Sequence, residues 1–349
     1  MKKGFIITIA IVLMVALAFT APVSAIKEAD TSVSISTGGG AAPIIKCKWE
    51  STSGSAAENG DPSHLIPGTQ VKAPGVYEGT QNINYWAVTT DPNGAADVKN
   101  VHAMVYHPDG SFKYKVEMLT KVANTDTAKA NVVAAYDAGL LVLNDDFTVE
   151  EILTELEQQD AFLWKGSEAI HYCQPAGDYE VVLNAYDQYN NWAVPLINTF
   201  TYMDLPLCEF DFLAVSYKDV NVGVHTWTGG DTNFGTADKP TVRNIGNVPL
   251  KIQVAQDDMG LGITSKGIWN VHYDVRLGPS PNTVDEYDPV HLKDAQWTPS
   301  ANDYFTMTDT LERCITEKLD FSIKIDQGMS GTYDGKIYLK CIPVPVCPA

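Results

Sequence analysis

Residues 101–118 read VHAMVYHPDGSFKYKVEM, and this stretch decides the fold class. Its second half, 112–118, alternates apolar and polar side chains, as a strand with one face in water must. Between the halves, His107-Pro108-Asp109-Gly110 has the chemistry of a turn, because proline presets φ and glycine accepts a positive φ. The sequence therefore predicts a hairpin in which 101–106 pairs with 112–118.

Similar alternation recurs along the rest of the chain. The turn at 175–178 precedes another predicted strand at 179–186. In the second half the alternating sets are Val220/Val222/Val224, Leu250/Ile252/Val254, Val271/Tyr273/Val275/Leu277, Leu319/Phe321/Ile323/Ile325 and Ile337/Leu339/Cys341. The last two sets flank Gly328-Met329-Ser330-Gly331, which predicts a terminal hairpin. Many short strands separated by turns favour antiparallel β-sandwiches over a parallel α/β sheet.

One helical segment, at about 126–163, interrupts this β pattern. Residues 127–137 are rich in alanine, and Thr148-Val149-Glu150-Glu151 is a capping box. Apolar residues at helical spacing follow, namely Val149, Ile152, Leu153 and Leu156, and we expect this stripe to pack on the sandwich. A boundary near 205–208 then divides the chain. We predict a first β-sandwich domain at 44–207, carrying the helical insert, and a second at 208–349.

The N-terminus has the three parts of a secretory signal peptide. Lys2 and Lys3 precede an apolar run from Phe5 to Phe19, and Val23 and Ala25 supply the small residues of a cleavage site. We predict cleavage after residue 25, followed by a flexible segment at 26–43. The alternative is an uncleaved membrane anchor, for which the run is near the minimum length.

Charge and cysteine content agree with export. The formal net charge of −19 disfavours nucleic acid and anionic lipid as partners. The six cysteines are Cys47, Cys173, Cys208, Cys314, Cys341 and Cys347. They form no CxxC motif, and an even number in an exported chain predicts disulfides, whose pairing the sequence leaves open.

Few residues suggest a chemical site. The seven histidines are scattered, and Gly328-Met329-Ser330-Gly331 is not a nucleophile elbow, so no catalytic residue and no resident cofactor is predicted. Asp91, Asn93 and Asp97 fall in one predicted loop, and hard oxygen ligands of this kind suit Ca²⁺. The alternative is ordinary turn chemistry, in which Asp and Asn bond to the local backbone.

Two other classes of function have weaker support. Trp227, Trp269, Trp297 and Tyr304 lie in the second half, where a flat exposed ring would stack on a sugar. Their alternative role is core packing or loop anchoring. A secreted hydrolase needs only two carboxylates that the fold brings together, and nothing in the sequence singles out such a pair.

Several stretches resemble known surface proteins. Residues 176–187, AGDYEVVLNAYD, with Asn190-Asn191 after them, resemble the last hairpin of PKD-like and other immunoglobulin-like surface domains. Residues 242–250, 319–325 and 330–333 resemble uncharacterised secreted proteins of methanogen-type archaea. The resemblance implies two immunoglobulin-like β-sandwich domains and a role in cell-surface architecture, adhesion or filament formation. It transfers no catalytic residue.

The sequence thus predicts a secreted, non-enzymatic structural or adhesion protein that contacts protein partners or copies of itself at the cell surface. Residues 32–36, SVSIS, are a candidate donor strand for a neighbouring sheet, with a disordered leader as the alternative. A carbohydrate- or envelope-binding module is the second hypothesis, and a secreted hydrolase the third.

Overall fold

The computed structural model describes residues 40–52, 69–118, 120–236, 238–278 and 304–344, with the backbone of two short strands at 288–289 and 291–293. These residues belong to one compact unit, Gly38–Ala349. The predicted signal peptide, the candidate donor strand and most of the 26–43 segment lie outside the described residues.

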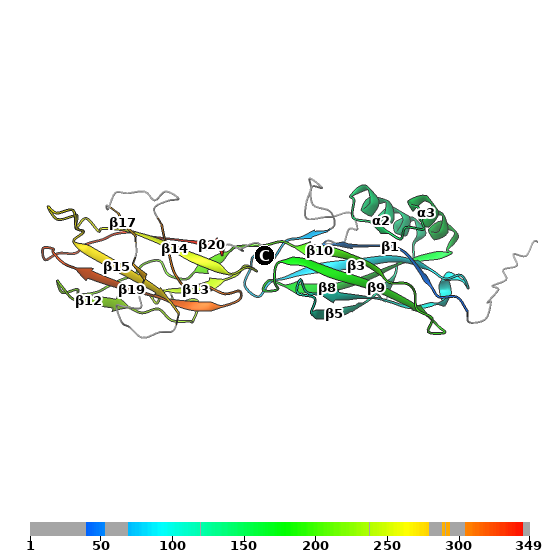
Figure 1. Cartoon of the computed structure of the whole chain (residues 1–349), viewed down its shortest axis with the longest axis horizontal. Helices are drawn as coiled ribbons and strands as arrows, with labels where there is room; N and C mark the ends of the chain where they lie inside the picture. The colour runs from blue at the N-terminus through cyan, green and yellow to red at the C-terminus, as the bar shows by residue number, and fades with distance from the viewer. Residues whose placement is uncertain are drawn as a thin grey trace, which may run out of the picture. The chain divides into compact units, whose positions relative to one another are not determined.

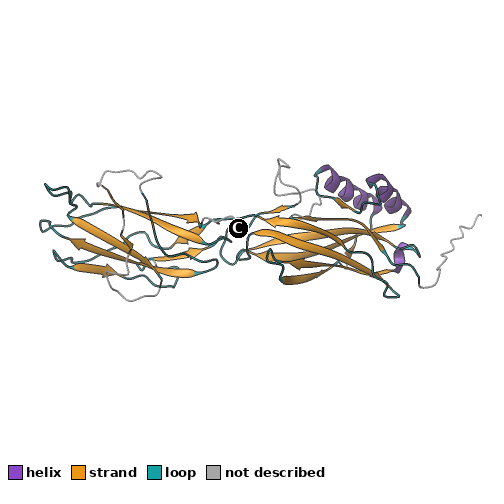
Figure 2. Ribbon diagram, in the orientation of Figure 1, coloured by secondary structure: helices purple, strands orange, loops and turns teal. Residues whose placement is uncertain are grey.

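The described strands between residues 44 and 202 form two five-stranded sheets (Figure 1, Figure 2). The first has the order β6 (Thr120–Lys121), β8 (Ala161–His171), β3 (Thr80–Thr90), β1 (Ile44–Ser51) and β7 (Val142–Leu143). The second has the order β2 (Gln70–Val71), β10 (Leu196–Tyr202), β9 (Gly177–Asp187), β4 (Val98–Tyr106) and β5 (Phe112–Glu117). Every neighbouring pair is antiparallel except β2 and β10.

A shared apolar core holds these two sheets together. Tyr85 from the first sheet and Val181 from the second both belong to it, and Tyr179 stacks on Phe200 with 5.2 Å between ring centroids. The predicted hairpin is confirmed, because β4 and β5 pair antiparallel around a turn in which Gly110 has a φ of 79°. The strand predicted at 179–186 is confirmed as part of β9.

Two helices cover the other face of the first sheet (Figure 1). They are α2 (Thr125–Asp137) and α3 (Val149–Gln158), and the predicted capping box at Thr148 and Glu151 is present. Val149, Ile152 and Leu156 are buried against this sheet, as the apolar stripe predicts. Strand β8 begins at Ala161, so the helical insert ends slightly before residue 163. No helix of the described chain is long and apolar enough to cross a membrane.

A β-bulge in β1 decides which of its side chains face the sandwich interior. The register between β1 and β3 shifts between Ile45 and Cys47. As a result Ile45 packs between the two sheets, whereas Cys47 and Trp49 pack beneath the helices. Lys48 and Glu50 alternate with Cys47 and Trp49, so they point between the sheets.

The described strands between residues 208 and 344 form two further sheets (Figure 2). One has the order β11 (Cys208–Phe210), β13 (Thr241–Asn244), β19 (Thr316–Ile325), β15 (Val271–Leu277) and β16 (Asp288–Pro289), and β12 (His225–Thr228) also pairs with β19. The other has the order β17 (His291–Lys293), β14 (Leu250–Asp257) and β18 (Phe305–Thr306), with β20 (Ile337–Pro343) paired along β14. A second apolar core, which includes Ile252, Val275 and Phe321, contains residues of both sheets.

Two sequence predictions in this region are wrong. Residues 220–224 form no strand: Gly223 adopts a φ of 81° in a turn, and Val222 and Val224 are exposed. The terminal hairpin is also absent, because β19 pairs with β15 whereas β20 pairs with β14 in the other sheet. Alternation therefore located the strands β14, β15, β19 and β20, but it did not identify the partner of each.

Four of the six cysteines form disulfides. Cys208 in β11 bonds to Cys341 in β20, and Cys173 bonds to Cys314. Cys47 forms no disulfide among the described residues, and burial raises the pKa of its thiol to about 12. Cys347 lies outside the described residues. The division into two domains at 207/208 stays a prediction, although strands and cores separate there.

Candidate functional site

The predicted calcium loop lies between β3 and β4, around the 3-10 turn η1 (Ala95–Asp97). The amide of Asn93 donates to Oδ1 of Asp91 (2.8 Å), which is local turn chemistry. Oδ2 of Asp91 and Oδ2 of Asp97 are buried and have no hydrogen-bond partner in the described chain. Burial first, and then the charges of Asp187 and Asp97, raise the pKa of Asp91.

Asp187, the third carboxylate near this loop, is satisfied by local bonds. Its Oδ1 accepts from the amides of Tyr189 and Asn191, each at 2.8 Å. Although burial opposes it, hydrogen bonding by Asn191 and Tyr189 holds the pKa of Asp187 below its usual range. Within the described ranges, no three His, Cys, Asp or Glu side chains are arranged to hold a metal ion. Calcium binding at Asp91, Asn93 and Asp97 therefore stays a prediction.

The aromatic residues predicted for sugar binding do not form a common platform among the described residues. Trp227 lies on β12 beside His225, and Trp269 is half-buried in a loop. Lys340 Nζ lies over the ring of Tyr304, 4.0 Å from its centroid. Trp297 lies outside the described residues.

A more exposed aromatic group lies at the turn between β9 and β10, where sequence analysis did not place one. Trp192 is 56% exposed and Tyr189 is 45% exposed. The ring of Trp192 also contacts Tyr186, at 4.9 Å between centroids, which fixes its position. A partly anchored, solvent-facing indole suits stacking on a flat apolar ligand surface. The asparagines at 190 and 191 signal the turn, but nothing in the sequence signals the exposure.

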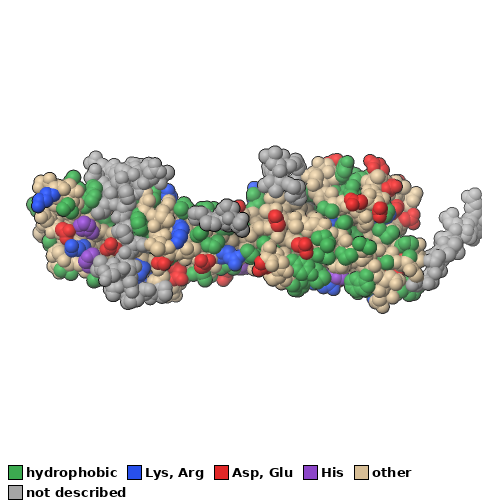
Figure 3. All heavy atoms as spheres, viewed as in Figure 1, with side chains coloured by type: hydrophobic (Ala, Val, Ile, Leu, Met, Phe, Trp, Pro, Cys, Tyr) green, Lys and Arg blue, Asp and Glu red, His purple; other side chains and the backbone are tan. Residues whose placement is uncertain are grey.

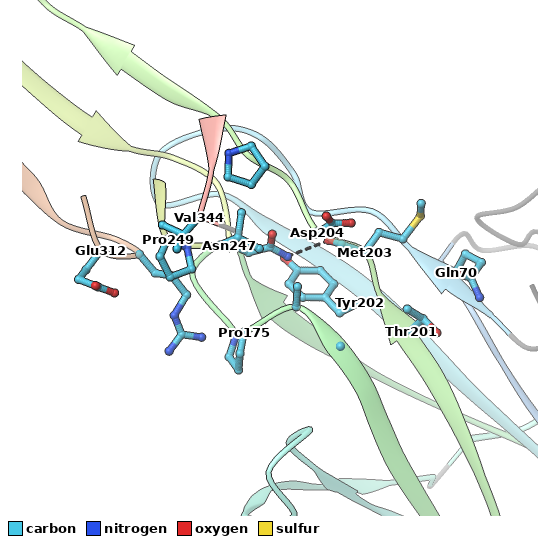
Figure 4. A pocket seen from close by; sticks show the side chains of 15 residues that line it. Gln70, Pro175, Thr201, Tyr202, Met203, Asp204, Asn247, Pro249, Glu312 and Val344 are labelled. Atoms are coloured by element: carbon cyan, nitrogen blue, oxygen red, sulfur yellow. Dashed lines mark hydrogen bonds between the residues drawn. The ribbon is translucent and has the colours of Figure 1, made fainter. Parts of the chain in front are cut away.

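A cavity of about 650 Å³ lies where β10 ends and the chain passes toward β11 (Figure 4). Its wall is held by Asn247, which accepts from the Leu205 amide at 2.6 Å and donates to Met203 O at 2.8 Å. Gln70 also lines it, and both polar atoms of this side chain are buried without a partner in the described chain. Asp204, Glu312 and Arg313 supply charge to its lining, and the hydroxyl of Thr201, which also lines it, donates to Oδ1 of Asp178 at 2.6 Å.

The first sandwich buries a second polar group that sequence analysis missed. Lys48 and Glu50 are each 1% exposed, and Lys48 Nζ lies 3.2 Å from Glu50 Oε1. Asn198 of β10 completes the group: its Oδ1 accepts from Lys48 Nζ, and its Nδ2 donates to Glu50 Oε2 at 2.6 Å. We call these three residues the Lys48 triad. Burial lowers the pKa of Lys48, and the charge of Glu50 only partly offsets this.

We call residues 44–202 the first region and residues 208–344 the second region. The second region buries a different ionic group. Asp320 of β19 is fully buried and is paired with Arg276 of β15, which is 2% exposed. Lys318 Nζ adds a second ion pair at 2.7 Å, and the Gly230 amide donates to Oδ1 at 2.9 Å. Three donors thus surround one carboxylate, which is how a buried charge is satisfied.

Two groups of surface side chains stand out, one of carboxylates and one of apolar residues. Figure 3 shows carboxylate side chains gathered over the helices α2 and α3. In the second region Leu213 is 97% exposed, and five further apolar side chains on three other loops are each more than half exposed: Val222, Val224, Ile263, Ile268 and Met329. Hydrogen bonds join these loops, from Gly223 N to Ile325 O and from Asp326 N to Asn270 O. We call the five residues the apolar loop cluster.

Comparison with known proteins leaves the family of this chain open. Neither a scan of protein-family models nor a search of curated proteins found a match. Among solved structures, the C-terminal domain of the Streptococcus pyogenes antigen I/II-family protein AspA is similar over 86% of this chain and 97% of that one, with 11% identity and a TM-score of 0.22. The Streptococcus agalactiae AgI/II polypeptide BspA C-terminal domain is similar over 87% of this chain and 97% of that one, with 9% identity and a TM-score of 0.22. At these TM-scores the similarities carry no functional argument.

Proposed function

We propose that this chain is a secreted, non-enzymatic structural or adhesion protein of the cell surface. In this proposal two immunoglobulin-like β-sandwich domains, divided at 207/208, follow a signal peptide that is removed after residue 25. The two disulfides support an extracytoplasmic location, because such bonds persist in oxidising compartments. The antiparallel sheets support a scaffold role.

The observation that carries the proposal is the apolar loop cluster. Exposed apolar side chains gathered on neighbouring loops mark contact surfaces on soluble proteins, since isolated ones are common but groups are not. Met329 is 84% exposed, and Val222 and Ile268 are 57% and 53% exposed. We infer that this cluster contacts a protein partner or another copy of the chain.

Light scattering of the signal-processed protein tests this proposal, with Ile268→Ser/Met329→Ser as the surface variant. We expect the wild type to form oligomers or larger assemblies that the double variant loses. Val194→Ser, which alters an exposed valine (85%) in the first region, is the matched control and should assemble like wild type. Wild-type protein that stays monomeric at all concentrations, and that retains no partner from envelope extracts through this cluster, would overturn the proposal.

A variant lacking residues 26–39 tests the donor-strand form of assembly. Among the described strands, β20 pairs only with β14, and we propose its other edge as the place where the strand is added. Loss of assembly in the truncated chain, but not in a chain whose 32–36 segment is replaced by another alternating sequence, would support strand addition. Unchanged assembly would restrict the contact to the apolar loop cluster.

Carbohydrate binding is the second candidate function, favoured by the exposed ring of Trp192. Here the test is a glycan array with the wild type and Trp192→Ala. Binding that the variant loses would support this function, and the absence of binding by the wild type would remove it.

A further inference from the structure

The Lys48 triad contains all the groups needed to make a covalent bond. We propose that Lys48 and Asn198 react to form an amide bond between their side chains, with Glu50 transferring the proton. This modification site is independent of the surface role proposed above, since it lies inside the first sandwich.

The position of the nucleophile is fixed by two acceptors. Lys48 Nζ donates to Val181 O at 2.8 Å and to Oδ1 of Asn198. The carbonyl carbon of Asn198 is one bond beyond that oxygen, so the amine and its target are held in contact. Because Lys48 lies on β1 and Asn198 on β10, the new bond would join the two facing sheets.

The orientation of the carboxamide follows from hydrogen-bond chemistry. An ammonium or amine here donates, and a carboxylate only accepts. Oδ1 of Asn198 must therefore face Lys48, and Nδ2 must face Glu50, as the structure has them. This arrangement directs the electrophilic carbonyl toward the amine and the leaving nitrogen toward the acid.

Burial makes the amine reactive. Lys48 is 1% exposed, and removal from water disfavours its charged form. The lowered pKa of Lys48 raises the fraction of neutral amine, which is the nucleophilic form. The same burial keeps out water that would compete for the carbonyl.

Glu50 bridges the two nitrogens that exchange a proton. Its Oε1 lies 3.2 Å from Lys48 Nζ, and its Oε2 lies 2.6 Å from Asn198 Nδ2. The carboxylate takes a proton from Nζ as the Nζ–Cγ bond forms, and it gives that proton to Nδ2 as the Cγ–Nδ2 bond breaks. Ammonia leaves, Glu50 is regenerated, and no oxidant or cofactor is required.

Intact-mass measurement of the wild type, unfolded and with its disulfides reduced, tests the proposal directly. We expect a mass below the sequence mass by one ammonia, and a branched peptide that joins Lys48 to Asn198 after trypsin digestion. The full sequence mass, with Lys48 open to acetylation in the unfolded protein, would overturn the proposal. A deficit that maps to succinimide at Asn93-Gly94 would overturn it as well.

Variants separate the chemistry from the packing. Glu50→Gln preserves the size of the side chain but cannot transfer the proton, and it should retain the full sequence mass. Lys46→Met is the matched control, because Lys46 is a buried lysine on the same strand that pairs with the Glu155 carboxylate at 2.6 Å and not with a carboxamide. It should keep the ammonia deficit. A folded Glu50→Gln variant, verified by circular dichroism, that still forms the branched peptide would refute the role of Glu50.

Discussion

The two β regions each bury a cation beside a carboxylate, but the partners differ. In the first, Lys48 and Glu50 meet the carboxamide of Asn198. In the second, Asp320 is surrounded by Arg276, Lys318 and a backbone amide. An arginine guanidinium stays protonated and is not a nucleophile. In the second cluster the other groups around the carboxylate are hydrogen-bond donors, none of which is an electrophile. The second cluster is therefore an electrostatic structure, whereas the first is arranged for reaction.

The covalent connections between sheets show the same difference. Cys208–Cys341 links β11 and β20, which belong to the two sheets of the second region. The proposed Lys48–Asn198 amide would link β1 and β10 across the first. One connection depends on the redox state of the surroundings and the other does not. The chain would thus stabilise two similar sandwiches by two different chemistries.

The largest effect is expected from breaking the purely electrostatic cluster. Asp320→Asn removes the buried carboxylate with which Arg276 and Lys318 both pair. We expect the free energy of unfolding to fall by about 3–5 kcal/mol, as measured by urea denaturation. Glu117→Gln is the control, because Glu117 forms a solvent-exposed pair with Lys115 and should cost about 1 kcal/mol or less. A loss for Asp320→Asn no larger than the control would contradict our reading of this cluster.

A smaller effect is expected from removing the disulfide of the second region. Cys208→Ser/Cys341→Ser opens a loop with a sequence separation of 133 residues, and we expect a loss of about 2–4 kcal/mol. Hydrogen exchange should increase in β14 and β20 but not in β1 and β10, if the proposed amide holds the first region. An equal increase in hydrogen exchange in both regions would mean that they unfold together. It would contradict the proposal that different covalent links stabilise them separately.

Local patterns in the sequence predicted local structure well. The hairpin around His107–Gly110 and the capping box at Thr148 depend on residues a few positions apart, and both are present. The terminal hairpin failed because the alternation of β19 and β20 is satisfied equally by β15 and β14, which are distant in sequence. Turn residues at 328–331 permit a hairpin without requiring one.

Sequence patterns could not predict the Lys48 triad, for a related reason. In IIKCKWES, residues 44–51, lysine and glutamate alternate with cysteine and tryptophan, which normally indicates a solvated face. The bulge at Ile45/Cys47 and the helices over Cys47 and Trp49 reverse this assignment. Asn198, in addition, is 150 residues away from Lys48. Only the packing of the two sheets shows that these three side chains meet.

The smallest change in stability is expected from a substitution of Asp91. This buried carboxylate differs from Glu50 and Asp320 because its charged neighbours are also carboxylates. Its pKa is raised in the folded state, so its contribution to stability is fully present below the unfolded pKa and is lost as the pH rises through the folded pKa. Asp91→Asn removes that loss and preserves the acceptor for the Asn93 amide. Without calcium, we expect the variant to be more stable than wild type near neutral pH, by about 1 kcal/mol, and equal to it in acid.

Calcium reverses this expectation if Asp91, Asn93 and Asp97 bind it. Thermal unfolding of both proteins at neutral pH, with millimolar CaCl₂ or with EDTA, distinguishes the two cases. A bound cation would neutralise the buried carboxylates, so the wild type would gain stability in calcium and the variant would not. If both proteins respond equally to calcium and EDTA, and the variant stays more stable, the loop is a turn. Glu50 and Asp320 would then be paired with cations of the chain itself, whereas the charge of Asp91 at neutral pH would be an uncompensated cost.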